Sequence, residues 1–278
     1  MADGGNQTHA QAVRRAADTY GAAADHYDRD TLAFWRRYGE LTIARLGPIP
    51  GRRVLDLCCG SGESALAAAR AVGPDGSVLG IDVAEPMLAL ARRKAAAAGL
   101  GNVEFRAADA TGTRLPDGAF DLVVCVFGVF FVPDQAAFVG EMWRLVAVGG
   151  ELALTTWGPG VFEPGNGEFW RAVDAETEPA ARFNPWDDIT TPAALAALMT
   201  AGGVPNPQVE AVSGHQPLAG PDAFWDIVLG TGYRSTVDRM TAPARERLRD
   251  RLHARLRALD VTEVRTDAVL GNARKSSG

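Results

Sequence analysis

Between residues 53 and 157, short runs of apolar and β-branched residues alternate with alanine-rich runs of helical spacing. Helix punctuation marks the alanine-rich runs, because Gly73 follows the first and Pro86 and Gly99 bracket the second. This alternation is typical of right-handed crossovers and predicts a doubly wound, mostly parallel sheet. The predicted strands are V-L-D-L from Val54, S-V-L-G-I-D from Ser77, V-E-F-R-A from Val103, F-D-L-V-V-C-V-F from Phe120 and G-G-E-L-A-L-T-T-W from Gly149.

The pattern changes after residue 157. Residues 158–190 are rich in glycine, proline and aromatic residues, and 222–260 predict one arginine-rich helical segment, so we interpret both as cap segments. Two more candidate strands, V-E-A-V at 209–212 and T-D-A-V-L-G-N-A at 266–273, raise the expected number of strands to seven. The core therefore spans 47–157 and is completed by residues 191–221 and 261–278.

Composition narrows the class of ligand. The chain has 278 residues, of which 47% are hydrophobic, and its 28 basic and 34 acidic residues give a net charge of −6. This charge disfavours nucleic acid and favours a small-molecule partner.

The longest apolar stretch, 122–132, is shorter than the roughly 18 residues of a membrane span, and the first residues lack a secretory signal. With only three cysteines and no disulfide framework, we expect a cytoplasmic protein.

A glycine loop follows the first predicted strand. Gly60 and Gly62 in C-C-G-S-G let the backbone approach a ligand, and the next helix offers free N–H groups at its start. In an open parallel sheet this turn is the usual ligand site. Adjacent Cys58 and Cys59 make a poor chelating pair, so we expect a cofactor cradle and no metal.

Two cofactors compete for this loop. G-S-G-E-S-A fits the nicotinamide fingerprint, and Asp82 lies twenty residues after Gly62, where an acid would hold a ribose. However, Asp56 lies four residues before Gly60, where its carboxylate would repel a pyrophosphate and attract an ammonium group. S-adenosylmethionine, which has a ribose, an ammonium group and a sulfonium, fits better than NAD, which stays the less favoured alternative.

Five motifs in order carry a family resemblance. V-L-D-L-C-C-G-S-G, G-I-D-V-A-E-P-M-L, A-A-D-A-T, F-D-L-V-V-C-V-F-G-V-F-F-V-P-D and G-G-E-L-A-L-T-T-W resemble the successive motifs of class I S-adenosylmethionine-dependent methyltransferases, above all the group with the ubiquinone and menaquinone C-methyltransferases. The resemblance is dense over residues 50–157. It implies a Rossmann-like fold in which residues 1–46 form an N-terminal helical lid. Cys58 departs from the motif, which has glycine there.

The resemblance also implies roles for individual residues. Asp56, Gly60 and Gly62 would surround the methionine moiety of the cofactor, and Tyr27 of the lid would reach its carboxylate. Asp82 would bind the ribose hydroxyls, and Met87 would pack on the adenine. The adenine amino group would donate to Asp109, and Ala110 would offer a backbone N–H. The last expected contact is the backbone carbonyl of Val126 with the ammonium group.

The acceptor is less well defined. F-G-V-F-F after the fourth strand and the aromatic cap favour a small hydrophobic or aromatic molecule. His26, next to Tyr27, is the candidate general base, whereas we expect His9 to lie in a disordered tail. Methylation at carbon, oxygen or nitrogen stays open, as does assembly into a homo-oligomer. A protein of this fold that binds the cofactor for other work, such as ring closure, is the main alternative.

Overall fold

The computed structural model describes residues 9–177 and 186–276. Residues 1–8 of the expected lid, 178–185 of the expected cap and 277–278 lie outside the described residues. The helices are α1 (His9–Ala23), α2 (Phe34–Ala44), α3 (Glu63–Val72), α4 (Glu85–Ala97), α5 (Gln135–Leu145), α6 (Gly165–Asp174), α7 (Pro192–Ala201), α8 (Phe224–Leu229), α9 (Arg234–Val237) and α10 (Ala242–Ala258). The strands are β1 (Arg53–Leu57), β2 (Ser77–Asp82), β3 (Val103–Ala107), β4 (Phe120–Val126), β5 (Val146–Trp157), β6 (Gln208–Val212), β7 (His215–Pro217), β8 (Glu263–Arg265) and β9 (Ala268–Arg274).

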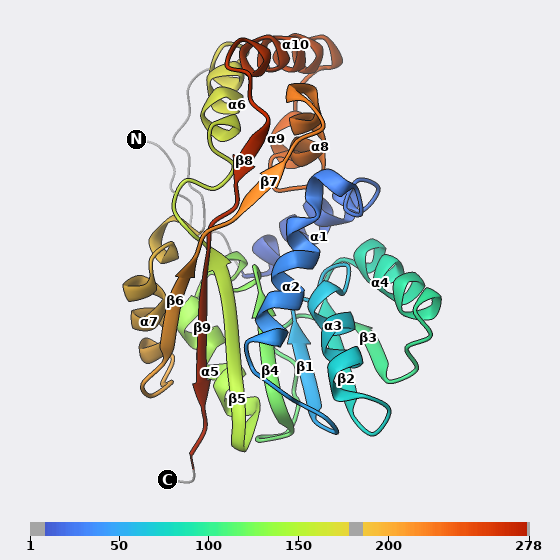
Figure 1. Ribbon diagram of the computed structural model, residues 1–278, viewed down its shortest axis with the longest axis vertical. Coiled ribbons are helices and arrows are strands. Elements are labelled where there is room, and N and C mark those ends of the chain that lie inside the picture. The colour runs from blue at the N-terminus through green and yellow to red at the C-terminus, as the bar shows by residue number, and fades with distance from the viewer. Residues whose placement is uncertain (1–8, 178–185, 277–278) are drawn as a thin grey trace.

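Seven strands form one sheet in the order β3-β2-β1-β4-β5-β9-β6 (Figure 1). The first five strands are parallel, and β9 runs antiparallel to both β5 and β6. The expected doubly wound, mostly parallel seven-stranded sheet is thus confirmed. Strand order reverses between β1 and β4, so a ligand site is expected at the carboxyl ends of these two strands.

Both faces of the central strands are buried. Along β1, Val54 belongs to the cluster that includes Leu66 of α3 and Leu88 of α4, whereas Leu55 belongs to the cluster with Phe138 of α5. All four residues of β1 after Arg53 are buried. Helices cover both sides of a parallel sheet, which explains why these strands are continuous apolar runs instead of alternating ones.

Helices α6, α8, α9 and α10 and the small β7–β8 sheet lie beyond the carboxyl ends of the strands (Figure 1). Ion pairs attach α10 to α6 and to the turn after it, because Arg255 binds Glu168 of α6 at 3.2 Å and Arg247 binds Glu176 of the turn at 2.8 Å. The sequence predicted one helical segment over 222–260, and the structure instead has three helices, interrupted around Gly230 and after Asp238. The β7–β8 pair was not predicted, because each strand has only three residues.

Of the two N-terminal helices, α1 lies near the carboxyl ends of the strands, and α2 runs along one face of the sheet beside α3 (Figure 1). Helix α2 packs closely on the start of α3, where a Cβ at Gly39 would come within 2.8 Å of the Ser64 amide nitrogen. Helix α1 contacts α4 and α9. No helix within the described ranges is both long and apolar enough to cross a membrane.

Candidate functional site

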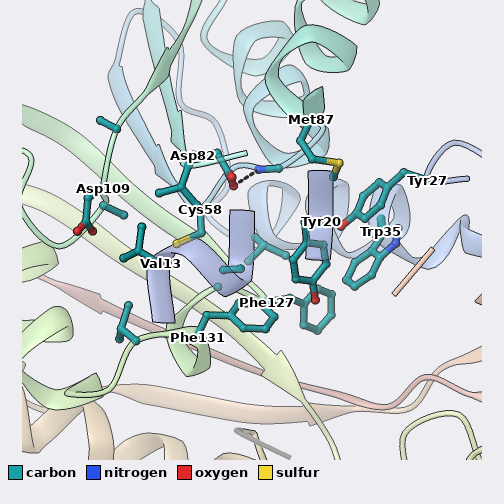
Figure 2. Close-up of a pocket in the computed structure, with 18 residues that line it drawn as sticks. Val13, Tyr20, Tyr27, Trp35, Cys58, Asp82, Met87, Asp109, Phe127 and Phe131 are labelled. Atoms are coloured by element: carbon teal, nitrogen blue, oxygen red, sulfur yellow. Dashed lines mark hydrogen bonds between the residues drawn. The ribbon is translucent and has the colours of Figure 1, made fainter. Parts of the chain in front are cut away.

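A cavity opens at the carboxyl ends of β1, β2 and β4, where the strand order reverses (Figure 2). The cavity and its open mouth together measure about 770 Å³. Most of the residues predicted for the cofactor meet here. Those that line the cavity are Tyr27, Gly60, Asp82, Met87, Asp109, Ala110 and Val126.

Asp82 joins the glycine loop to the end of β2. One carboxylate oxygen accepts from the Gly60 amide at 2.8 Å and the other from the Ala84 amide at 2.9 Å. Burial raises the pKa of Asp82, and these backbone donors partly offset that rise. The side chain is therefore fixed in place, and each oxygen keeps a lone pair for a ligand.

The two glycines of the loop serve different purposes. Gly60 (φ +50°) faces the cavity, because a Cβ there would lie 3.5 Å from Met87 Cε and 3.9 Å from the Tyr27 hydroxyl oxygen. Gly62 (φ +84°) does not line the cavity, since its Cβ would press within 2.9 Å of Ala91 Cβ on α4. Gly62 thus permits close packing of α3 and α4.

Cys58 lines the cavity where the motif has glycine, and it adopts a left-handed φ of +57°. A side chain in this conformation costs about 1 kcal/mol. Its thiol hydrogen-bonds the Cys125 side chain on β4, and this bond, together with burial, raises the pKa of Cys58 well above its usual value. The loop therefore keeps the conformation that glycine would favour despite the substitution.

Asp56 lies beneath the cavity and does not line it. The side chain is completely buried, and Oδ2 accepts from the Ser64 hydroxyl at 2.6 Å. Its Oδ1 has no hydrogen-bond partner among the described residues. Burial, together with the negative charge of Asp82, raises the pKa of Asp56 to about 7. A cation above the loop would favour the ionised form.

His9 lies in helix α1, so the expectation of a disordered tail was wrong for this residue. Its Nε2 is 2.5 Å from Oδ2 of Asp109, on the loop after β3, and Asp109 Oδ1 accepts from the Thr111 amide and hydroxyl. Burial alone would raise the pKa of Asp109, but the bonds from His9 and Thr111 outweigh it and lower that pKa. Helix α1 is thereby attached to the predicted adenine end of the cavity.

Helix α1 also supplies a wall that the sequence prediction missed. Val13, Ala16 and Tyr20 line the cavity, and their spacing of three and four residues places them on one helical face. The Tyr20 ring meets Phe131 edge-on at 5.2 Å between centroids. The helical spacing was a usable signal, but nothing local shows that this face covers the loop.

Aromatic side chains make up one side of the cavity (Figure 2). Tyr27 stacks on Trp35 with a centroid distance of 5.1 Å and an interplanar angle of 5°. Phe127, which has a left-handed φ of +56°, stacks on Trp157 at 3.9 Å. Asp82 and Asp109 lie toward the opposite side. The cavity is therefore divided into a polar side and an aromatic side.

The structure does not bring His26 into this cavity. Its Nδ1 lies 2.8 Å from Oδ1 of Asp25, and the ring lines a separate hollow with Trp225 and Arg245. A general base must come within hydrogen-bond reach of the proton that it removes. His26 does not meet this condition for a molecule in the cofactor cavity as the structure stands.

Comparison with known proteins defines the family. Residues 54–150 match a family model described as a methyltransferase domain. A demethylmenaquinone methyltransferase from Geobacillus kaustophilus is 37% identical over 162 residues, which are 56% of this chain and 68% of that protein. The chain belongs to the class I S-adenosylmethionine-dependent methyltransferases.

One further relative and two solved structures are also similar to this chain. The nocamycin O-methyltransferase of Saccharothrix syringae is 31% identical over 207 residues, which cover 74% of this chain and 68% of that enzyme. The YcgJ protein of Bacillus subtilis shares the fold with a TM-score of 0.57 at 18% identity, over 87% of this chain and 100% of that one. The [4+2]-cyclase SpnF has the fold too, with a TM-score of 0.54 at 20% identity, over 87% and 82% of the two chains.

The relatives resolve the choice between functions. Because SpnF shares only the fold at 20% identity, it does not favour ring closure over methyl transfer. The relatives at 37% and 31% identity are both methyltransferases by name. The protein is an S-adenosylmethionine-dependent methyltransferase, and the nicotinamide alternative raised by G-S-G-E-S-A is not supported.

Proposed function

We propose that this methyltransferase transfers the methyl group to a carbon, oxygen or nitrogen atom of a small hydrophobic or aromatic acceptor. The division of the cavity carries this proposal. Asp82 and Asp109 occupy the side that would hold the cofactor, whereas Trp35, Phe127 and Phe131 offer an aromatic surface to the second molecule. Aromatic faces suit a flat apolar ring, and they also attract a sulfonium cation.

The names of the relatives support the same class of acceptor. Besides the demethylmenaquinone and nocamycin enzymes, the aklanonic acid methyltransferase of a Streptomyces strain is 32% identical over 143 residues, 51% of this chain and 65% of that enzyme. Each of these names refers to a small molecule. The net charge of −6 further favours such an acceptor over nucleic acid.

The residues present fit S-adenosylmethionine. Asp82 would accept hydrogen bonds from the ribose hydroxyls with the lone pairs that its two backbone donors leave free. Asp109 and Ala110 would hold the adenine, with Met87 packed on it. Tyr27, whose hydroxyl lies beside Gly60, would bind the methionine carboxylate, and the Val126 carbonyl its ammonium group. The buried Asp56 oxygen, which has no hydrogen-bond partner in the described ranges, would support that cation from beneath the loop.

When bound, the cofactor supplies a methyl group on a positively charged sulfur. The protein's part is to align the acceptor with that methyl group and to exclude water. Helix α1 covers the cavity with Val13, Ala16 and Tyr20 and thus serves both purposes. The raised pKa values of Tyr20 and Tyr27, which burial causes, keep both phenols protonated, so they donate hydrogen bonds.

A panel of acceptors tests the proposal. The purified protein is incubated with S-adenosylmethionine and, separately, with a short-chain prenyl-1,4-naphthohydroquinone, a hydroxyanthraquinone carboxylic acid and phosphoethanolamine. Release of S-adenosylhomocysteine and the mass of the product are measured. We expect methylation of at least one aromatic acceptor and none of phosphoethanolamine. Methylation of phosphoethanolamine alone would overturn the proposal.

A further inference from the structure

We infer that the Tyr20 hydroxyl donates a hydrogen bond to an oxygen of the methyl acceptor. The acceptor would then carry a phenol, enol or carbonyl oxygen at, or next to, the atom that is methylated. This inference rests on the proposed function and narrows its substrate class. Tyr20 would contact the acceptor directly and would therefore be a catalytic residue in addition to those that hold the cofactor.

The four tyrosines of the chain divide into two kinds. The Tyr38 hydroxyl donates to the Thr266 carbonyl, and the Tyr233 hydroxyl donates to Oδ1 of Asn166 at 2.7 Å. Tyr20 and Tyr27 have no such hydroxyl partner within the described part of the chain, and both line the cavity. Both side chains are half-buried in the cavity wall, so these two phenols are suited to donate hydrogen bonds to bound molecules.

The two cavity phenols point to different molecules. The Tyr27 hydroxyl lies beside Gly60, in the loop predicted to hold the methionine moiety of the cofactor. Figure 2 shows the Tyr20 hydroxyl directed away from Asp82 and Met87 and toward the side of Phe127. The Tyr20 ring is also held edge-on against Phe131. Tyr20 therefore belongs to the aromatic side, where the acceptor would bind.

The chemistry of transfer gives this hydrogen bond a purpose. A lone pair of the acceptor, on an ionised oxygen or on the carbon of its enolate, forms the new bond to the methyl carbon. The carbon–sulfur bond breaks, its electrons stay on sulfur, and S-adenosylhomocysteine leaves. The acceptor's proton passes to solvent before transfer, and negative charge collects on its oxygen. Since burial keeps Tyr20 protonated, Tyr20 stabilises this oxyanion as a donor and does not act as the base.

The test compares Tyr20→Phe with the wild type and with Tyr233→Phe, which removes one tyrosine hydroxyl outside the cavity. The acceptor is the naphthohydroquinone or anthraquinone that the wild type methylates. We expect Tyr20→Phe to lower kcat/KM for the acceptor by about 10- to 100-fold, as for a lost hydrogen bond to a charged oxygen. Its affinities for S-adenosylmethionine and S-adenosylhomocysteine, measured by calorimetry, should stay within twofold. Tyr233→Phe should leave kcat/KM within about threefold.

A second readout separates an electrostatic role from a structural one. The absorbance of 4-nitro-1-naphthol, bound together with S-adenosylhomocysteine, reports its ionisation against pH. We expect Tyr20→Phe to raise the apparent pKa of the bound naphthol by about one unit, because the oxyanion loses a donor.

Three results would decide against the inference. Equal kcat/KM values and equal naphthol titrations in wild type and Tyr20→Phe would overturn it. Equal losses of acceptor turnover and of S-adenosylmethionine affinity would also overturn it, because Tyr20 would then act on the cofactor. A wild type that methylates no aromatic acceptor would instead overturn the proposed function, and the inference with it.

Discussion

Replacement of Asp56 by asparagine is expected to stabilise the protein without its cofactor and to weaken cofactor binding. The Asp56 carboxyl is fully buried, and one oxygen has no hydrogen-bond partner among the described residues. An ionised carboxylate at this buried position destabilises the folded protein, because it has lost its hydration. A neutral amide of the same shape avoids most of this cost. The same negative charge is what would attract the cofactor's ammonium group.

The magnitude follows from the pKa. Burial and Asp82 raise the pKa of Asp56 from 3.8 to about 7. The pKa of Asp56 is higher in the folded protein than in the unfolded chain, so the protonated carboxyl stabilises the fold. This contribution is complete below about pH 4 and is lost as the pH rises through about 7. At about 1.4 kcal/mol per pKa unit, the full loss is about 4 kcal/mol, of which roughly 2 kcal/mol falls between pH 5.5 and pH 8.

Urea unfolding of wild type and Asp56→Asn at pH 5.5 and pH 8, without cofactor, measures this effect. The free energy of unfolding of the variant, relative to wild type, should rise by about 2 kcal/mol from pH 5.5 to pH 8. Asp121→Asn is the control. Asp121 binds Arg53 at 2.9 Å, which lowers its pKa, so its carboxyl stays ionised at both pH values and its effect should not change between them. If the free energies of unfolding of Asp56→Asn and wild type differ by the same amount at pH 5.5 and pH 8, the reasoning is refuted.

Two further substitutions test the loop. Asp82→Asn should weaken S-adenosylmethionine binding at least tenfold by calorimetry, because the amide accepts at only one of its two positions, and an unchanged affinity would remove Asp82 from the proposed ribose site. For Cys58→Gly, the free energy of unfolding in urea should stay within about 1 kcal/mol of the wild-type value. Glycine relieves the strain of the left-handed backbone at residue 58, and this gain offsets its greater freedom in the unfolded chain. A loss well above that value would show that the contact with Cys125 matters more than the backbone conformation.

The sequence alone determined the parallel core and the centre of the site. Each predicted strand from 53 to 157 is a local apolar run, and each intervening helix is marked by nearby glycine or proline, so the pattern needs no long-range information. Gly60 and Asp82 were predictable for the same reason. Their positions at strand ends place them together once the strands are parallel neighbours.

Tertiary structure decided the roles that depend on which way a side chain faces. Asp56 and Gly62 belong to the expected loop, but packing directs Asp56 into the core and Gly62 toward α4. His26 was expected at the site because it is next to Tyr27 in sequence, yet the turn after α1 directs it to another hollow. Neighbours in a turn can point in opposite directions, and local pattern does not say which of them faces the cavity.

Contacts between distant parts of the chain could not be predicted from the sequence either. His9 meets Asp109 across one hundred residues, and β7 pairs with β8 across nearly fifty. Tyr20 faces the aromatic side only because α1 docks against α4 and the segment after β4. A helical pattern reports that one face of α1 is apolar, but the surface against which that face packs depends on the path of the whole chain. The sequence thus determined the loop that we propose for the cofactor, and only the folded chain decided what covers it.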